Sequence, residues 1–139
     1  MGTRAQIVLM PGDGVGPEIV AQAVKTMDAV SKRFDIEFAT TEVAIGGAAL
    51  DAYGIPLRPE DLAVCKKADA VLLGAVGGPA WDNIAVSLRP ERGLLALRKG
   101  MRLFANLRPV AVDAELADSS PVKREIVSGT DLVVVRELT

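Results

Sequence analysis

The sequence predicts an α/β protein in which a mixed sheet carries helices on its faces. Three observations support this fold class. Short apolar runs, typical of buried strands, alternate along the chain with segments of helical periodicity. Glycine and proline punctuate the ends of these runs. The chain has 139 residues, of which 50% are hydrophobic and 24% are charged, which is the composition of an ordinary globular domain.

The expected strands are recognised by their apolar or β-branched composition. We predict strands over Gln6–Met10, Ile36–Val43, Ala70–Val76 and Asp131–Glu137, with an extended segment over Leu103–Val112. Ala70–Val76 is the clearest buried strand, because it is apolar throughout and is followed by glycines. The last strand has no following element to cover it, which we interpret as a sign that the chain is truncated.

The expected helices are marked by start signals and by apolar spacing. Pro17 suits a first helical turn, and apolar residues then recur at helical spacing from Ile19 to Arg33. The other helical segments that we predict are shorter: Gly46–Gly54, Arg58–Ala68, Glu91–Met101 and a short one after Ser119.

Composition argues against several function classes. Sixteen basic and 18 acidic residues give a net charge of −2, which offers no basic surface for nucleic acid or a membrane. Apolar runs are all shorter than the roughly 20 residues that span a bilayer. A single cysteine, Cys65, cannot form an internal disulfide, which favours the cytoplasm. Histidine is absent, so acid–base chemistry would need other side chains.

The segment Pro11–Glu18 (PGDGVGPE) has the setting of a dinucleotide-binding turn, because Gly12 and Gly14 follow a strand and precede a helix. In the fingerprint G-x-G-x-x-G the third glycine would stand at position 17, where this chain has Pro17. The Rossmann interpretation therefore fails on spacing. Two interpretations stay open: a tight turn from strand to helix, or a turn that also contacts a ligand.

The segment Gly74–Asp82 (GAVGGPAWD) places glycines and a proline at the C-terminal end of the clearest strand. In open α/β sheets this end faces the ligand crevice, and glycines there let backbone amides approach a phosphate or ribose. The alternative is an ordinary loop in which Trp81 packs onto the core.

The segment Pro90–Pro109 combines arginines with an apolar composition. If Glu91 starts a helix, four residues at positions i, i+3, i+4 and i+7 share one face: Glu91, Leu94, Leu95 and Arg98. A plain core face would be apolar throughout, because a buried arginine without a partner costs several kcal/mol. The mixed face suits a small ligand that carries an alkyl group beside a carboxylate.

Two further arginines lie in extended segments. Arg108 precedes Pro109, and Arg136 follows an apolar strand. Together with Arg98 they could hold a dicarboxylic acid through bidentate hydrogen bonds. The alternative is that the arginines pair on the surface, for example Arg98 with Glu91, and that the leucines are core. We interpret the remaining basic residues of this region as solvated surface: Arg89, Arg92, Lys99 and Arg102.

These motifs resemble one family when they are taken together. The segments PGDGVGPE, VLLGAVGGPAWD, RPERGLLALRK, FANLRPV and VVVREL are similar, in order and spacing, to the N-terminal part of the 3-isopropylmalate dehydrogenase family. That family is a branch of the β-decarboxylating dehydrogenases, which include isocitrate dehydrogenases. The resemblance covers essentially the whole chain and implies a non-Rossmann α/β fold of the isopropylmalate/isocitrate dehydrogenase type, here as an incomplete portion.

The resemblance also implies roles for particular residues. Substrate carboxylates would be bound by Arg98, Arg108 and Arg136, and the isopropyl group by Glu91, Leu94 and Leu95. Contacts to NAD would come from Gly78, Pro79, Ala80, Trp81, Asp82 and Glu91. Ala80 stands where many relatives have lysine, which puts a charged contact there in doubt. The two leucines favour an alkyl-substituted malate over isocitrate, whose third carboxylate they cannot bind.

The implied reaction is the NAD-dependent oxidative decarboxylation of 3-isopropylmalate in leucine biosynthesis, with Mg²⁺ or Mn²⁺ as Lewis acid. Family members are more than twice as long, and their catalytic tyrosine and lysine and metal-binding aspartates follow the position of Thr139. We therefore assign no catalytic residue and no metal ligand to this chain, and we expect it to be inactive alone. Residues 1–103 would belong to a first, NAD-side domain, and residues 104–139 would begin a second domain. The resemblance implies that the complete protein is a cytoplasmic homodimer whose contact lies mainly in this second domain.

Two other hypotheses remain. The chain could be a non-catalytic α/β module that binds a nucleotide or a small dicarboxylate. It could also be an interaction fragment in which the arginines do not converge. The substitution Arg108→Ala would distinguish them, because it abolishes dicarboxylate binding in the first case and changes nothing in the second.

Overall fold

The computed structural model describes residues 3–138, which form two compact units, one ending at Arg102 and the other beginning at Leu103. The first unit contains a three-stranded sheet and the second a two-stranded sheet. The division falls one residue before the predicted domain boundary. The assignment of the two units to domains of a longer protein stays a prediction.

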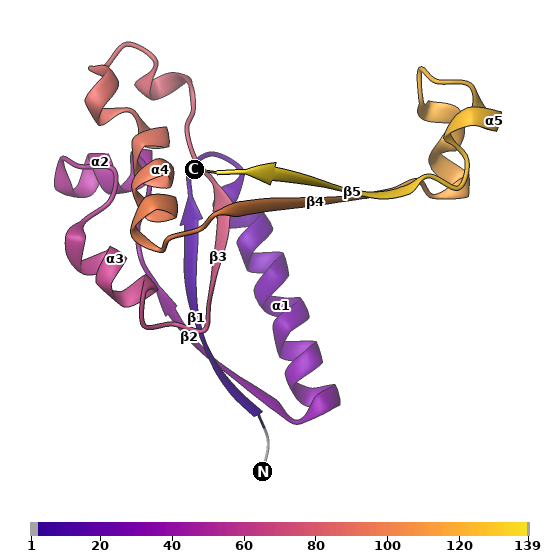
Figure 1. Cartoon of the computed structure of the whole chain (residues 1–139). Helices are drawn as coiled ribbons and strands as arrows, with labels where there is room; N and C mark the ends of the chain where they lie inside the picture. The colour runs from indigo at the N-terminus through magenta and orange to yellow at the C-terminus, as the bar shows by residue number, and fades with distance from the viewer. Residues whose placement is uncertain (1–2, 139) are drawn as a thin grey trace. The chain divides into compact units, whose positions relative to one another are not determined.

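The first unit is built on a parallel sheet of order β2–β1–β3 (Figure 1), formed by β1 (Thr3–Gly12), β2 (Ile36–Glu42) and β3 (Ala70–Ala75). The central strand β1 pairs with both neighbours: Leu9 lies opposite Glu42 of β2 and opposite Leu72 of β3. Both faces of β1 are covered, since Val8, Leu9 and Met10 are each at most 7% exposed. The predicted parallel arrangement of strands separated by helices is present in this unit.

Strand β3 is less buried than its sequence predicts. Ala70 is exposed and the other residues of the strand are half-buried, so the prediction that this is the clearest buried strand is wrong. The reason is its position, because β3 is an edge strand of the sheet that residues 3–138 form.

Helices cover both faces of the parallel sheet. Helix α1 (Gly16–Phe34) lies on one face and contacts all three strands, while α2 (Gly47–Tyr53), α3 (Pro59–Cys65) and α4 (Pro90–Gly100) lie on the other side (Figure 1). Helix α1 has Pro17 in its first turn and ends where Asp35 adopts a left-handed conformation with φ 52°. The core of the unit joins β1 to α3 and α4 through Val8, Met10, Ile45, Cys65 and Leu97.

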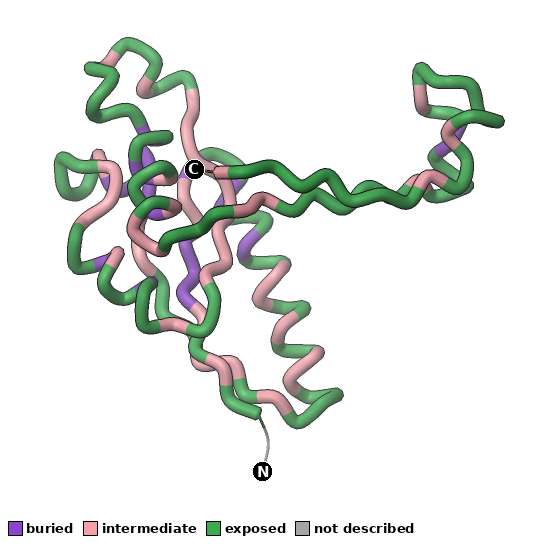
Figure 2. The backbone as a smooth tube through the Cα atoms, viewed as in Figure 1, coloured by how far each residue is buried: buried purple, intermediate pink, exposed green. Residues whose placement is uncertain are grey.

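The second unit is an antiparallel hairpin of β4 (Ala105–Ala111) and β5 (Asp131–Glu137). Its connection contains a 3-10 helix at Ala114–Ser119, which the sequence analysis missed, and the short helix α5 (Arg124–Val127), which lies in the predicted place after Ser119. Figure 2 shows exposed residues along most of both strands. Within residues 103–138 only Ala117 is buried, so this unit has almost no core of its own.

Candidate functional site

The carboxyl ends of β1 and β3 are in very close backbone contact. Gly12 has φ 72°, and a Cβ atom on it would lie 1.9 Å from the carbonyl oxygen of Ala75. The N–H of Asp13 donates to the same oxygen at 2.7 Å. The close packing therefore requires glycine at position 12 of the segment PGDG, as the tight-turn interpretation expects. Its contact with a ligand stays a prediction.

Asp13 is a buried carboxylate that the sequence analysis missed. It is 3% exposed, and it accepts three backbone hydrogen bonds of 2.8 Å: Oδ1 from the N–H of Ala48, and Oδ2 from the N–H groups of Gly47 and Gly77. These partners lie 34 to 64 residues away along the chain, so no local spacing reveals them. The available signal was an acidic residue between two glycines, directly after a buried strand.

The predicted cofactor loop starts next to Gly77 and packs against α2. It forms a 3-10 turn at Pro79–Trp81. A Cβ atom on Gly47 would lie 2.3 Å from the indole ring of Trp81, so the ring rests directly on the first turn of α2. The indole N–H also donates to Oδ1 of Asp51 at 3.0 Å. Trp81 is thus a packed residue, while the exposed members of the loop are Pro79, Ala80 and Asp82.

Glu91 reaches this loop from the first turn of α4. A Cβ atom on Gly77 would lie 2.5 Å from Oε1 of Glu91, so the carboxylate lies directly against the Gly77 backbone. The structure therefore brings Glu91 together with the start of the glycine-rich loop. The contact of either with a cofactor stays a prediction.

The predicted mixed face of α4 lies beside the face that enters the core. Gly93 and Leu97 are the buried residues of the middle of the helix. Leu94 and Arg98 are half-buried, and Leu95 is 51% exposed. This exposure argues against the alternative that Leu95 is plain core, and it leaves an alkyl surface next to a guanidinium group.

Arg108 and Arg136 lie on the same face of the β4–β5 hairpin. The register pairs Asn106 with Arg136 and Arg108 with Val134, and residues opposite each other in an antiparallel pair project from one face. The Nε of Arg108 donates to Oδ1 of Asn106 at 2.9 Å, which holds the guanidinium along that face. Both arginines are exposed. Arg98 belongs to the other unit.

The alternative in which the arginines pair on the surface lacks support. Among residues 3–138, ion pairs are formed by Arg4, Arg58 and Arg124, and none includes a predicted substrate arginine. The expected surface pair of Arg98 with Glu91 is not formed.

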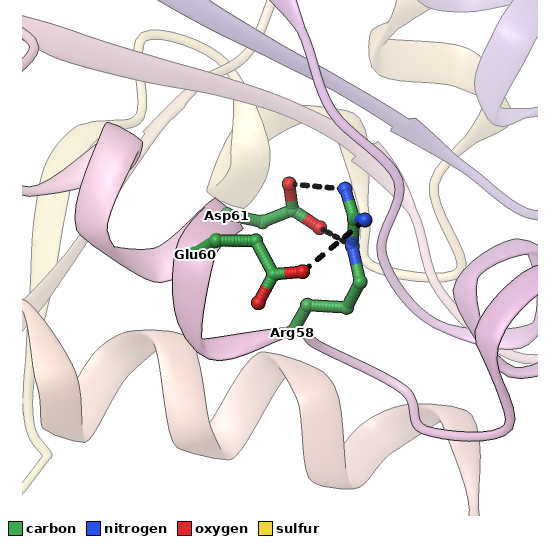
Figure 3. A network of polar contacts seen from close by, with 3 residues as sticks. All are labelled: Arg58, Glu60 and Asp61. Atoms are coloured by element: carbon green, nitrogen blue, oxygen red, sulfur yellow. Dashed lines mark hydrogen bonds and ion pairs between the residues drawn. The ribbon is translucent and has the colours of Figure 1, made fainter.

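A separate polar cluster lies at the start of α3 (Figure 3). The Nε and Nη2 atoms of Arg58 donate to the carboxylate of Asp61 at 2.8 and 2.9 Å, and Nη1 pairs with Glu60 at 3.2 Å. The guanidinium also lies 3.9 Å from the ring centroid of Tyr53. The hydrogen bonds to Asp61 raise the pKa of Arg58. Because Asp61 is 3% exposed, we interpret this cluster as structural: Arg58 supplies the hydrogen bonds that the buried Asp61 carboxylate needs in the first turn of α3.

Within residues 3–138, no group of three or more His, Cys, Asp or Glu side chains is placed to hold a metal ion. No helix in the same range is long and apolar enough to cross a membrane.

Comparisons with known proteins confirm the resemblance. A profile of the family described as isocitrate/isopropylmalate dehydrogenase matches residues 6–139. A 3-isopropylmalate dehydrogenase of Moorella thermoacetica is 58% identical over 135 residues, which are 96% of this chain and 38% of that protein. The corresponding protein of Anaeromyxobacter dehalogenans is 55% identical over 98% of this chain and 38% of its own length. The chain thus spans about two-fifths of the length of these curated relatives.

Solved structures agree on the fold. A β-decarboxylating dehydrogenase of Thermococcus kodakarensis superposes with a TM-score of 0.67 at 33% identity, covering 96% of this chain and 33% of that protein. An isocitrate dehydrogenase of Methylococcus capsulatus gives a TM-score of 0.71 at 28% identity, covering 97% of this chain and 35% of that protein. The predicted fold class, an α/β fold of the isopropylmalate/isocitrate dehydrogenase type, is therefore confirmed, and the chain belongs to the isocitrate/isopropylmalate dehydrogenase family.

Proposed function

We propose that the chain supplies part of an NAD-dependent enzyme that oxidises and decarboxylates 3-isopropylmalate in leucine biosynthesis. Sequence identity of 58% to a protein named 3-isopropylmalate dehydrogenase supports the choice of substrate. The observation that carries the proposal is the pair Arg108 and Arg136 on one face of the hairpin, with Arg108 held by Asn106. Such a pair suits the carboxylates of a small diacid.

The arginines would act by positioning and by electrostatics. Arg98, Arg108 and Arg136 would each bind a substrate carboxylate oxygen and offset its charge, which fixes the orientation of the malate carbon chain. None of them needs to move a proton. The proton-transfer groups of the reaction would come from residues that follow Thr139.

The face of α4 would select the alkyl group. Leu94 and Leu95 present apolar surface beside Arg98, and Glu91 lies one turn before them. An isopropyl group gains from contact with the leucines, whereas the third carboxylate of isocitrate would lose its hydration there without a partner.

We assign the NAD contacts to the glycine-rich loop. Pro79, Ala80 and Asp82 are exposed, so a ligand can reach this part of the loop. Gly78, Trp81 and Glu91 complete the proposed contacts. When bound, NAD supplies the hydride acceptor. A divalent Mg²⁺ or Mn²⁺ ion would be held by residues after Thr139, and we assign it none of residues 3–138. We further expect the complete protein to be a cytoplasmic homodimer.

A chimera tests the proposal. In the chimera, the 139-residue chain replaces the matching segment of the Moorella thermoacetica relative. We expect NADH formation with 3-isopropylmalate in the presence of Mg²⁺, at least about a hundredfold lower kcat/KM with isocitrate, and no turnover by the 139-residue chain alone. Arg108→Ala in the chimera should lower kcat/KM for 3-isopropylmalate by about a hundredfold or more.

Arg102→Ala changes an exposed arginine that we assign to the surface, and it should leave kcat/KM unchanged. A folded chimera without NADH formation would count against the dehydrogenase proposal. Binding of 3-isopropylmalate by the 139-residue chain, abolished by Arg108→Ala, would then favour the binding module.

A further inference from the structure

Three segments of the first unit meet at the carboxylate of Asp13: the turn after β1, the start of α2 and the loop after β3. We propose that Asp13 is a positioning residue that fixes the loop Gly77–Asp82 against α2 and thereby presents the loop to its ligand. The identity of that ligand as NAD rests on the proposed function, whereas the fixing of the loop does not.

The burial of Asp13 is offset by hydrogen bonds alone. Among residues 3–138, no ion pair includes this carboxylate. Its three N–H partners replace the lost water, and two of them are the first N–H groups of α2. The N-cap of that helix is Gly46, which has no side chain to serve those groups, so Asp13 caps α2 from a distant segment.

The site fits a carboxylate of this length. Three donors need an acceptor with two oxygens and no N–H, which the aspartate side chain provides. A Cβ atom on Gly46 would lie 2.4 Å from Oδ2 of Asp13, so the carboxylate fills the space beside the backbone there. Asparagine would turn an amide N–H toward at least one of the three donors.

The loop is therefore held at two points. At its root, the N–H of Gly77 is bound by Asp13. At Trp81, the ring rests on Gly47 and the indole N–H is bound by Asp51. Both points of attachment involve α2, because Asp13 also binds the Gly47 N–H. Loss of the Asp13 carboxylate frees the root of the loop and the first turn of α2 together, and it should move Trp81 away from that helix.

Fluorescence tests this directly, because Trp81 is the single tryptophan of the chain. In Asp13→Ala, we expect the acrylamide quenching constant of Trp81 to rise about twofold while the far-UV circular dichroism stays that of a folded protein. The matched control is Asp69→Asn. Oδ2 of Asp69 also accepts a backbone N–H, that of Gln6 at 2.7 Å, but at the opposite end of β3. The acrylamide quenching constant of Trp81 in Asp69→Asn should equal that of the parent chain. An unchanged quenching constant in a folded Asp13→Ala variant overturns the proposal.

A conservative variant keeps the test decisive if Asp13→Ala does not fold. The single carbonyl oxygen of Asp13→Asn can serve at most two of the three donors. Hydrogen exchange measured by NMR should therefore be about tenfold faster for at least one of the Gly47, Ala48 and Gly77 amides. Three amides that exchange as slowly as in the parent chain overturn the proposal.

The chimera adds the functional readout. Asp13→Asn should raise the KM for NAD about tenfold and change kcat by less than about twofold, because it displaces a binding loop and leaves the reacting groups in place. A lowered kcat with an unchanged KM for NAD overturns the proposal. If the unsubstituted chimera shows no NAD-linked turnover, the proposed function fails, and the fluorescence and exchange results still decide the role of Asp13.

Discussion

At the scale of single residues, Cys65 shows how burial controls reactivity. Its side chain is fully buried, and burial first, with the negative charge of Asp61 second, raises the pKa of the thiol above its ordinary value of 9.0. The thiolate is the nucleophilic form, so a buried protonated thiol reacts slowly. We expect iodoacetamide at about pH 8 to label Cys65 about a hundredfold more slowly in the folded chain than in urea, as mass spectrometry would measure. Similar labelling rates would contradict this.

The same thiol makes stability depend on pH. Because the folded chain binds the Cys65 proton more tightly than the unfolded chain, its contribution is complete below the ordinary pKa and is lost as pH rises through the folded pKa. The difference in unfolding free energy between the parent chain and Cys65→Ala, measured by urea titration, should therefore shrink as the pH rises above the ordinary thiol pKa of 9.0. A constant or growing difference would show that the pKa is not raised.

Residue-scale prediction from sequence works where the signal is local. The face formed by Glu91, Leu94, Leu95 and Arg98 follows from helical spacing, and the structure has a helix over these positions. The role of Asp13 was not predicted, because its hydrogen-bond partners belong to segments that are remote in sequence. Hydrogen bonds between remote segments depend on the assembled fold, which spacing along the chain does not encode.

At the scale of elements, the turn between β1 and α1 offers a matched pair of glycines. Gly12 and Gly14 have φ 72° and 55°, but a Cβ atom would lie 1.9 Å from the Ala75 carbonyl oxygen at Gly12 and would meet nothing within 4 Å at Gly14. Gly14→Ala should therefore cost about 1 kcal/mol of unfolding free energy, and Gly12→Ala about 4 kcal/mol, because it adds a clash to the strain. Urea titrations would measure both, and equal losses would contradict the close contact between strand ends.

Periodicity predicted the existence of most elements, but not their ends or their neighbours. Helix α3 ends at Cys65, before the predicted end at Ala68, and α4 starts at Pro90, one residue before Glu91. The 3-10 helix Ala114–Ser119 was missed because a turn this short has no apolar repeat to reveal it. The apolar composition of β3 indicates a strand but cannot show that the strand lies at an edge.

At the scale of the whole molecule, the two units differ in how their apolar residues are covered. The core of the first unit is continuous from β1 to α3 and α4. In the second unit the strands also carry large apolar side chains, yet Leu107, Val133 and Val135 are each more than half exposed. The apolar composition of β5 therefore predicts a strand correctly, but composition alone cannot distinguish a covered strand from an exposed one.

This difference predicts unequal local stability. A two-stranded hairpin with little core is marginally stable, so its amides should open often, whereas those of β1 are protected by packing on both faces. Hydrogen–deuterium exchange with mass spectrometry should label residues 105–111 and 131–137 at least about a hundredfold faster than residues 7–10. Equal protection at all concentrations would contradict the unequal stability of the units. Protection of the hairpin that appears only as the concentration rises, with a matching increase in sedimentation coefficient, would show instead that its exposed valines are covered by a second copy of the chain.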